Sequence, residues 1–310
     1  MRRRLLAVTL ALAAWVGGTV AGGLGSAPAA GVPVFQVGRA HAEFQPALTG
    51  DEPIFVLLLG SDARPGTELD HGLADSIHVL GINPEARRAT LFGIPRDSWV
   101  SLASGGTNKI NAAMPPGGVD GELATVEQLT GITFDYYVLT GFDGFIGAID
   151  GIGGLTVDVP YTVDGYATTF APGVQELRGA QALDLARTRK TLPRGDFDRS
   201  LHQGLLMASA LGQFRKEYAK DAGSVFTWLG AGLRNVRTDL SVDELMRFAN
   251  LALAVKPVNV TNLVAIGTNG NESGRSVVYL ADSNRPLWDD LAADGYILAK
   301  DVPADNRIQT

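Results

Sequence analysis

The strongest restriction on the fold comes from short apolar runs that alternate with amphipathic stretches after residue 53. The run IFVLLL at residues 54–59 is continuously apolar and stops at Gly60, which is typical of a buried strand. Similar patterns predict strands at residues 76–82, 89–94, 136–139, 155–159, 262–266 and 276–279, and helices at residues 123–129, 142–149, 179–187, 198–218, 241–254 and 282–293. This alternation predicts an α/β fold, with three α-β-α layers around a central mixed sheet.

The first 38 residues have a different character. Arginines at positions 2–4 precede residues 5–24, an uncharged run close to the roughly 20 residues that a bilayer crossing needs. The basic start orients the N-terminus toward the cytoplasm, so an uncleaved helix would give a single-pass cell-membrane protein with an extracytoplasmic domain. A cleaved signal peptide is the alternative, with small residues at 27–30 and a secreted product. We favour the anchor because the apolar run is long.

The expected domain organisation follows from this contrast. Residues 1–38 hold the membrane anchor or signal segment and the start of a linker, residues 39–53 the linker, residues 54–295 the main domain and residues 296–310 a C-terminal tail. The absence of cysteine excludes a disulfide framework, a cysteine-ligated zinc and a catalytic thiol. The net charge of −7 argues against a nucleic-acid binder.

Polar residues lie beside three of the predicted strands. Asp62 and Arg64 follow the first strand, Asp75 stands at the start of the second, and Arg96 and Asp97 follow the third. Because ligands of such sheets bind at strand ends, we expect the three carboxylates to converge with both arginines beside them. Mg²⁺ typically bridges one or two carboxylates to a substrate phosphate, so these residues are candidates for a magnesium site. For a single aspartate, the ordinary alternative is a turn or cap role.

A second polar cluster, rich in arginine, begins at Arg187. Arg187 and Arg189 are two residues apart and would face one way on an extended segment. Arg199 and Gln203 are four apart and would share one face of the long predicted helix, with Asp196 just before it. Several inward guanidiniums could hold a pyrophosphate, since each charged hydrogen bond contributes about 1.5–3 kcal/mol. A solvated charged loop is the usual alternative.

These clusters belong to a longer series of sequence blocks: GSDARPG (60–66), ADSI (74–77), GIPRDSWVSL (93–102), NKINAA (108–113), TVEQLTGITFDYYVLTGFDGF (125–145), IDGIGGLTVDVP (149–160), LRGAQALDLARTRK (177–190) and DFDRSLHQ (196–203). In order and spacing the blocks resemble the LytR-CpsA-Psr family, over about residues 54–295. Members of that family are membrane-anchored extracytoplasmic phosphotransferases. They move a glycopolymer from a polyprenyl-pyrophosphate carrier to the 6-hydroxyl of muramic acid in peptidoglycan, through a phosphodiester.

The resemblance implies that residues 54–295 are a catalytic domain with Mg²⁺ as its cofactor. It implies that Asp62 and Asp75 hold the metal, and that Asp75, Arg96 and Asp97 are catalytic, with Asp75 or Asp97 as the base. The implied pyrophosphate and lipid-carrier site comprises Arg64, Arg96, Arg187, Arg189, Asp196, Arg199 and Gln203. The role of the NKIN block stays open. Positioning and electrostatic stabilisation are the main catalytic effects in phosphoryl transfer.

The implied partners are a polyprenyl-pyrophosphate-linked glycan, peptidoglycan and the cytoplasmic membrane, with no nucleic acid, and we expect a monomer. The lipid needs an apolar groove, for which the helical segments at residues 201–214 and 245–253 are candidates. His78 lies inside an apolar strand and is expected to be a packed histidine.

One residue departs from the family pattern. The family usually has an arginine two positions before the aspartate of its second block, where this chain has Leu73 before Asp75. Two other classes of function therefore stay open: a pyrophosphatase that acts on the same lipid-linked glycans, and a non-catalytic binding or regulatory protein of the cell envelope. Which glycopolymer is used is not encoded in these motifs.

Overall fold

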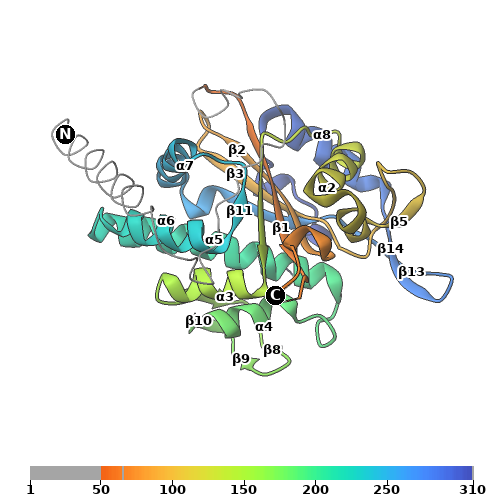
Figure 1. The fold of residues 1–310 in the computed structure, drawn as a ribbon, viewed down its shortest axis with the longest axis horizontal. Helices are drawn as coiled ribbons and strands as arrows, with labels where there is room; N and C mark the ends of the chain where they lie inside the picture. The colour runs from red at the N-terminus through yellow and green to blue at the C-terminus, as the bar shows by residue number, and fades with distance from the viewer. Residues whose placement is uncertain (1–49, 65, 309–310) are drawn as a thin grey trace, which may run out of the picture. The chain divides into compact units, whose positions relative to one another are not determined.

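The computed structural model describes residues 50–64 and 66–308, and a six-stranded sheet lies at its centre (Figure 1). β1 is antiparallel to β2 and parallel to β6, while β3 is antiparallel to β2 and parallel to β12, so the sheet is mixed. The strand order is β11-β6-β1-β2-β3-β12. The strands are β1 (Ile54–Ser61), β2 (Ala74–Asn83), β3 (Arg88–Gly93), β6 (Tyr136–Gly141), β11 (Arg237–Thr238) and β12 (Val260–Val264).

Helices cover both faces of the sheet (Figure 1). α2 (Met114–Thr130) and α8 (Arg285–Asp294) pack on one face. The other face carries α3 (Phe142–Gly151), α4 (Gly179–Arg187), α5 (Asp196–Lys220), α6 (Ser224–Asn235) and α7 (Val242–Ala254). The three-layer α-β-α fold that the sequence predicts is confirmed.

Neighbouring residues of the central strands belong to different apolar cores. Leu57 and Leu59 of β1 are buried with residues of α2 and α8, whereas Val56 and Leu58 lie on the side of α5 and α7. This follows from the period of two in a strand. Burying one such side chain contributes about 1.5–3 kcal/mol. A register slip by one residue would exchange the two faces, so the two cores together fix the register.

The strand directions bring several strand ends to one edge of the sheet. Because β2 is antiparallel to β1 and to β3, its start lies beside the ends of both, and β6 ends at the same edge. The pairing shifts between Gly60 and Ser61, whose partners are Ser76 and Ala74, so Asp75 is the extra residue of a bulge. A bulge redirects side chains at the end of a strand pair. The edge therefore collects polar residues from three separate turns.

Most predicted elements are present with small shifts, except that the helix predicted at residues 123–129 is only the second half of α2, which has a kink at Gly118. β12 begins two residues before the predicted strand, and the predicted last helix is a short 3-10 turn (Asp282–Asn284) followed by α8. A capping box begins α7: Ser241 Oγ accepts from Glu244 N at 3.3 Å, and Glu244 Oε2 accepts from Ser241 N at 2.7 Å.

Several short elements escape prediction. They form two-stranded ribbons around the main sheet: β4 (Trp99–Ser101) with β5 (Thr107–Lys109), β7 (Leu155–Val159) with β10 (Gly173–Leu177), β8 (Val163–Asp164) with β9 (Thr169–Phe170), and β13 (Gly267–Glu272) with β14 (Arg275–Leu280). Of these strands, the sequence predicts β7 and most of β14. β4, β5, β8 and β9 have two or three residues and are too short to carry a readable hydrophobic period. β13 (GTNGNE) has no apolar residue, and the two apolar residues of β10 (GVQEL) do not alternate with a period of two.

The structure describes the C-terminal segment to residue 308 but not the N-terminal segment. Ile297 and Val302 are buried in the core beside α8, and Asn306 Nδ2 donates to Val264 O at 2.8 Å, so the segment after residue 295 packs on the main domain. The expected anchor or signal segment lies outside the described residues. Within residues 50–64 and 66–308, no helix is long and apolar enough to span a bilayer.

Candidate functional site

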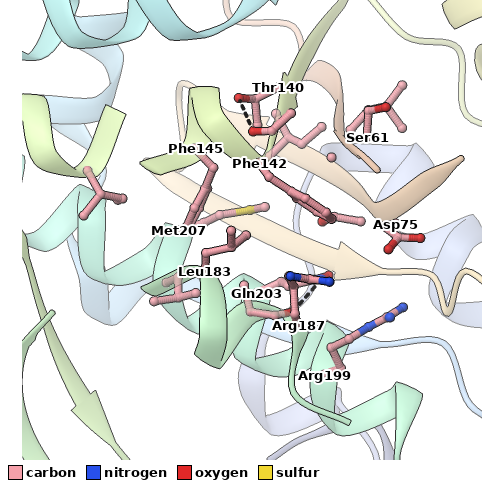
Figure 2. Close-up of a pocket in the computed structure, with 18 of the residues that line it drawn as sticks. Ser61, Asp75, Thr140, Phe142, Phe145, Leu183, Arg187, Arg199, Gln203 and Met207 are labelled. Carbon is pink, nitrogen blue, oxygen red and sulfur yellow. Dashed lines mark hydrogen bonds between the residues drawn. The ribbon is translucent and has the colours of Figure 1, made fainter. Parts of the chain in front are cut away.

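A pocket of about 370 Å³ lies between the sheet and the helices α3, α4 and α5. Figure 2 shows that its two ends differ: Asp75, Arg187 and Arg199 lie toward one end, and Phe145, Leu183 and Met207 toward the other. The polar end lies at the sheet edge where β1 and β6 end and β2 begins. A cavity of this kind suits a ligand with a charged head and an apolar tail.

Asp75 and Arg96 form an ion pair at the polar end. Arg96 Nη1 donates to Asp75 Oδ1, and both side chains line the pocket. Burial alone would lower the pKa of Arg96, but the charge and hydrogen bond of Asp75 raise it above its usual value. Arg96 Nε is buried and has no hydrogen-bond partner among the described residues. An unbonded buried donor is costly, so it marks a place where a ligand oxygen can bind.

Four further residues of the predicted arginine cluster line the same pocket: Arg187, Arg189, Arg199 and Gln203. Arg187 ends α4, and its guanidinium lies over the ring of Phe142, 4.5 Å from the centroid. Arg199, in the first turns of α5, is 3% exposed and its Nη2 lies 2.7 Å from Asp196 Oδ1. Gln203 lies one turn later and its Nε2 donates to Ala186 O at 3.0 Å. The prediction that Arg199 and Gln203 share one helix face is therefore confirmed.

Arg199 and Gln203 both keep atoms for a ligand. Arg199 Nε and Gln203 Oε1 are buried without a hydrogen-bond partner in the described part of the chain. Burial lowers the pKa of Arg199, partly offset by the charge of Asp196. Because an arginine starts from a pKa far above neutrality, Arg199 stays charged at pH 7. The pocket thus holds fixed positive charge next to unbonded polar atoms.

Asp97 lies behind the pocket wall as an anchor for two cations. Lys109 Nζ donates to its Oδ1 at 2.9 Å, and Arg189 Nη1 donates to its Oδ2 at 3.1 Å. Burial alone would raise the pKa of Asp97, but Lys109, with help from Arg96 and Arg189, holds it below its usual value. A carboxylate with a lowered pKa is a weak base. Asp97 therefore holds Arg189, which does line the pocket. It also contacts the NKIN block, through Lys109.

Asp62 and Arg64 lie apart from the pocket lining. Asp62 Oδ1 accepts from Leu73 N at 2.7 Å, and its own N–H donates to Leu73 O at 3.0 Å. The carboxylate therefore closes the turn that leads into β2. Arg64 is exposed, and Leu73, the position that departs from the family pattern, is half-buried.

Asp196 and Arg194, both in the second polar cluster, have different structural roles. Asp196 is buried beside Arg199 and 4.0 Å from Arg189, so it supports two pocket arginines from behind. Arg194 points elsewhere: its Nε donates to Asp198 Oδ1 at 2.8 Å and its Nη2 to Arg307 O at 2.8 Å. Arg194 thus fastens the C-terminal segment to the start of α5.

The residues present fit a magnesium ion that is completed by its substrate. Within residues 50–64 and 66–308, no group of three or more His, Cys, Asp or Glu side chains could hold a metal by itself. Asp75 faces the pocket, whereas Asp62, which follows β1, lies outside the pocket lining and accepts from Leu73 N. Mg²⁺ is usually held by one or two carboxylates with phosphate oxygens and water. One or two carboxylates beside an arginine cluster match that pattern.

The apolar end of the pocket differs from the predicted groove in one helix. Leu206, Met207 and Ala210 of α5 line the pocket, as predicted for that helix. The α7 residues predicted with them do not. Phe248 and Leu251 instead line a second apolar cavity of about 160 Å³ under α7, which shares Leu58 and Met207 with the first. The remaining apolar wall comes from α3, α4, β6 and β7: Val138, Phe142, Phe145, Ile149, Leu155 and Leu183.

Sequence reasoning missed the apolar wall residues and two serines, Ser61 and Ser76, that line the polar end. Hydrophobic periodicity identifies a buried face but does not distinguish a side chain in a core from one lining a cavity. Ser76 lies in the ADSI block, one position after Asp75. Its position next to a predicted metal ligand is the sequence signal that could have identified it.

Comparisons with known proteins agree with this geometry. A profile of the LytR_cpsA_psr family matches residues 35–291. A polyisoprenyl-teichoic acid–peptidoglycan teichoic acid transferase, TagU of Bacillus mycoides (strain KBAB4), is 35% identical over 202 residues. That match spans 64% of this chain and 64% of the relative, so somewhat less than two thirds of the relative's length is matched.

Solved structures share the fold. The crystal structure of TagV from B. subtilis superposes with a TM-score of 0.68 at 26% identity, over 82% of this chain and all of that one (100%). The protein gbs0355 from Streptococcus agalactiae gives a TM-score of 0.70 at 24% identity, over 81% of this chain and 90% of that one. Since the family profile covers most of the length, the chain belongs to the LytR_cpsA_psr family.

Proposed function

We propose that this chain is an extracytoplasmic phosphotransferase that moves a glycopolymer from a polyprenyl-pyrophosphate carrier to the muramic acid 6-hydroxyl of peptidoglycan. One observation carries the proposal: a single pocket joins an arginine-lined head site to an apolar chamber (Figure 2). The related TagU is named as a transferase of polyisoprenyl-linked teichoic acid to peptidoglycan, which supports the same classes of donor and acceptor.

The affinity for such a donor would come from both ends of the pocket. Each buried CH₂ of an isoprenoid contributes about 0.8 kcal/mol. Each charge-assisted hydrogen bond from arginine to phosphate contributes about 1.5–3 kcal/mol. A free phosphorylated sugar lacks the first contribution and a simple lipid lacks the second. The pocket therefore favours an amphiphile with a pyrophosphate head.

The polar side chains act mainly by position and charge. Arg96, Arg187 and Arg199 surround the head site and would neutralise the negative charge that grows on the bridging and terminal oxygens. Ion pairs with Asp75 and Asp196 fix Arg96 and Arg199 before the substrate arrives, and Arg187 is stacked on Phe142, so little reorganisation is needed. Mg²⁺ held by Asp75 with Asp62 would add positive charge at the phosphate oxygens.

The proposal extends to place and assembly. The uncharged run at residues 5–24 supports anchoring in the cytoplasmic membrane, with the pocket on the outer side where both donor and acceptor occur. We propose that the chain works there as a monomer, because one chain supplies both ends of the pocket.

The test is incubation with a synthetic polyprenyl-pyrophosphate glycan and nascent peptidoglycan, with and without Mg²⁺. A covalent glycan–peptidoglycan product that depends on Mg²⁺ is the expected result. Free polyprenyl phosphate together with a soluble glycan phosphate would make the chain a pyrophosphatase. Binding without any turnover would make it a non-catalytic envelope protein.

A further inference from the structure

Two polar side chains of β2 form a pair beside the head site. Ser76 lines the pocket, and its Oγ lies 3.2 Å from Nδ1 of the fully buried His78. On the far side of the ring, His78 Nε2 lies 3.0 Å from Ser200 O on α5. Within the described part of the chain, Ser76 Oγ makes no other hydrogen bond.

Glycines on the two neighbouring strands leave space for this pair. Ser76 is opposite Gly60 on β1, and His78 is opposite Gly93 on β3. A Cβ at Gly60 would lie 2.9 Å from Ser76 Cβ, and one at Gly93 would lie 3.1 Å from His78 Nε2. Side chains at either glycine would crowd the pair, so the neighbouring strands are built around it.

The hydrogen-bond partners determine where the protons are. Ser200 O is a carbonyl and can only accept, so Nε2 carries the ring hydrogen. Nδ1 of the neutral ring is then an acceptor, and the Ser76 hydroxyl donates to it. Burial, together with the nearby charge of Arg199, lowers the pKa of His78 to about 4, which keeps the ring neutral. The lone pairs of Ser76 Oγ are therefore left for the pocket.

Donors outnumber acceptors at this end of the pocket, where Gln203 Oε1 is a second acceptor without a hydrogen-bond partner in the described part of the chain. Arg96, Arg187 and Arg199 are pure donors that suit phosphate oxygens. Of the carboxylates, Asp75 is paired with Arg96, and Asp97 is paired twice outside the lining. The reactant that brings a hydrogen to this site is the hydroxyl group that attacks phosphorus, so an oxygen acceptor has a natural partner there.

We infer that Ser76 Oγ accepts a hydrogen bond from the attacking hydroxyl and orients it toward phosphorus, and that His78 is the positioning residue that keeps Ser76 in this state. This rests on the proposed function. As the hydroxyl oxygen bonds to the phosphorus next to the glycan, the bond from that phosphorus to the bridging oxygen breaks. Polyprenyl phosphate leaves with the bridging oxygen, and the hydroxyl proton passes to solvent.

The test compares turnover with donor binding in four variants of the full chain. Ser76→Ala removes the hydroxyl oxygen that accepts from the nucleophile. His78→Leu removes the ring nitrogen to which the Ser76 hydroxyl donates. His78→Asn keeps an acceptor near the position of Nδ1. Tyr161→Phe is the matched control, because the Tyr161 hydroxyl forms a similar pair with the buried His202 Nε2 at 3.1 Å, outside the pocket lining.

We expect Ser76→Ala and His78→Leu to lower kcat for glycan transfer at least about tenfold, since misplacing a reacting group by about 1 Å can cost about 10²-fold. The Kd for geranylgeranyl pyrophosphate should stay within about twofold of wild type, because the arginines are untouched. His78→Asn should recover part of the lost kcat, and Tyr161→Phe should keep the wild-type rate.

Other results would overturn the inference. Transfer by Ser76→Ala at the wild-type rate would show that the hydroxyl group does not orient the nucleophile. An equal loss of donor affinity would make Ser76 a donor-binding residue. A His78→Asn variant as slow as His78→Leu would remove the positioning role. A wild-type chain without transfer would instead contradict the proposed function, and the inference with it.

Discussion

Charged side chains at the head site are held by partners and still keep atoms for a ligand. Arg96 bonds Asp75 through Nη1 while its Nε is unbonded in the described structure, and Arg199 contacts Asp196 in a similar way. Such pairing sets the direction of each guanidinium in advance. It also means that loss of the acid changes two things at once: the carboxylate disappears, and an arginine is released.

For Asp75→Ala we expect transfer to fall below about one tenth of wild type, because a metal ligand and its charge neutralisation are lost. Binding of geranylgeranyl pyrophosphate without Mg²⁺ should hold or tighten, since Arg96 is freed. Circular dichroism checks the fold. Asp70→Ala is the control: Asp70 pairs with Arg237 at 17% and 28% side-chain exposure, against 18% and 21% for Asp75 and Arg96. Asp75→Ala with nearly full transfer would contradict the assignment.

Leu73→Arg restores the residue that the family pattern expects. Leu73 is half-buried beside Asp62 and outside the pocket lining, so little packing is lost and an arginine is long enough to turn toward the head site. We expect geranylgeranyl pyrophosphate to bind up to about tenfold more tightly, the value of one charge-assisted bond. The melting temperature should change little. An unchanged affinity at unchanged stability would show that position 73 does not serve the pocket.

At the scale of elements, α5 carries two different arginine systems at its start. Arg199 lies in the pocket, whereas Arg194, just before the helix, bonds Asp198 and Arg307 O and holds the C-terminal segment. Arg187 reaches the pocket from the end of α4, stacked on Phe142. Neighbouring basic residues in the sequence thus divide into those that line the pocket and one that fastens the C-terminal segment.

This division predicts opposite phenotypes. Arg187→Ala should weaken geranylgeranyl pyrophosphate binding about tenfold and leave stability nearly unchanged, because its guanidinium faces the pocket. Arg194→Ala should lower the free energy of unfolding by about 2 kcal/mol or more, because the buried Asp198 loses its partner, with donor affinity retained. Urea unfolding and isothermal titration calorimetry on both variants distinguish the two effects. Equal effects of both substitutions on affinity would contradict this division.

The elements also show what local sequence can and cannot predict. β1 and α5 have strong periodicity, and the spacing of Arg199 and Gln203 was enough to assign their shared face. α6 contains Gly230 and Gly232, which lower helix propensity, and it was not predicted. The position of α7 over the second cavity depends on tertiary packing, which no local pattern reports.

The sequence predicts the site residues that meet where strand ends converge. It does not predict the positions of side chains that a turn redirects. Asp75 and Arg96 meet because β2 starts where β3 ends. Asp62 turns back to Leu73, and Arg64 leaves the edge. The pair of Ser76 and His78 required the register between strands and the approach of α5, because a histidine in an apolar strand looks like core packing in the sequence.

For the whole molecule, two buried histidines couple folding to pH. Burial lowers the pKa of both His78 and His202 to about 4, below the value of 6.5 expected for an unfolded histidine. Between those values the unfolded chain binds protons that the folded chain does not. The stability that the two rings contribute is therefore fully present above pH 6.5 and is lost as the pH falls toward 4, by about 1.4 kcal/mol per pH unit for each histidine. Burial raises the pKa of Glu122, which acts in the opposite direction.

Urea unfolding at pH 7.5, 6 and 5 checks this dependence. We expect a fall in the free energy of unfolding from pH 6 to 5, and a fall smaller by about 1.4 kcal/mol in His202→Gln, which has lost one of the two buried rings. A free energy that is constant between pH 7 and 5 would contradict the buried, neutral state of both rings.

Transfer and hydrolysis differ in the fate of the phosphate next to the glycan, so a donor labelled at that phosphate distinguishes them. The label is followed in a mixture of the wild-type chain, Mg²⁺ and peptidoglycan. If the pocket performs transfer, the label becomes covalently bound to peptidoglycan in equal amount to the polyprenyl phosphate released. Label recovered as a soluble glycan phosphate, or left entirely on the lipid, would contradict the account.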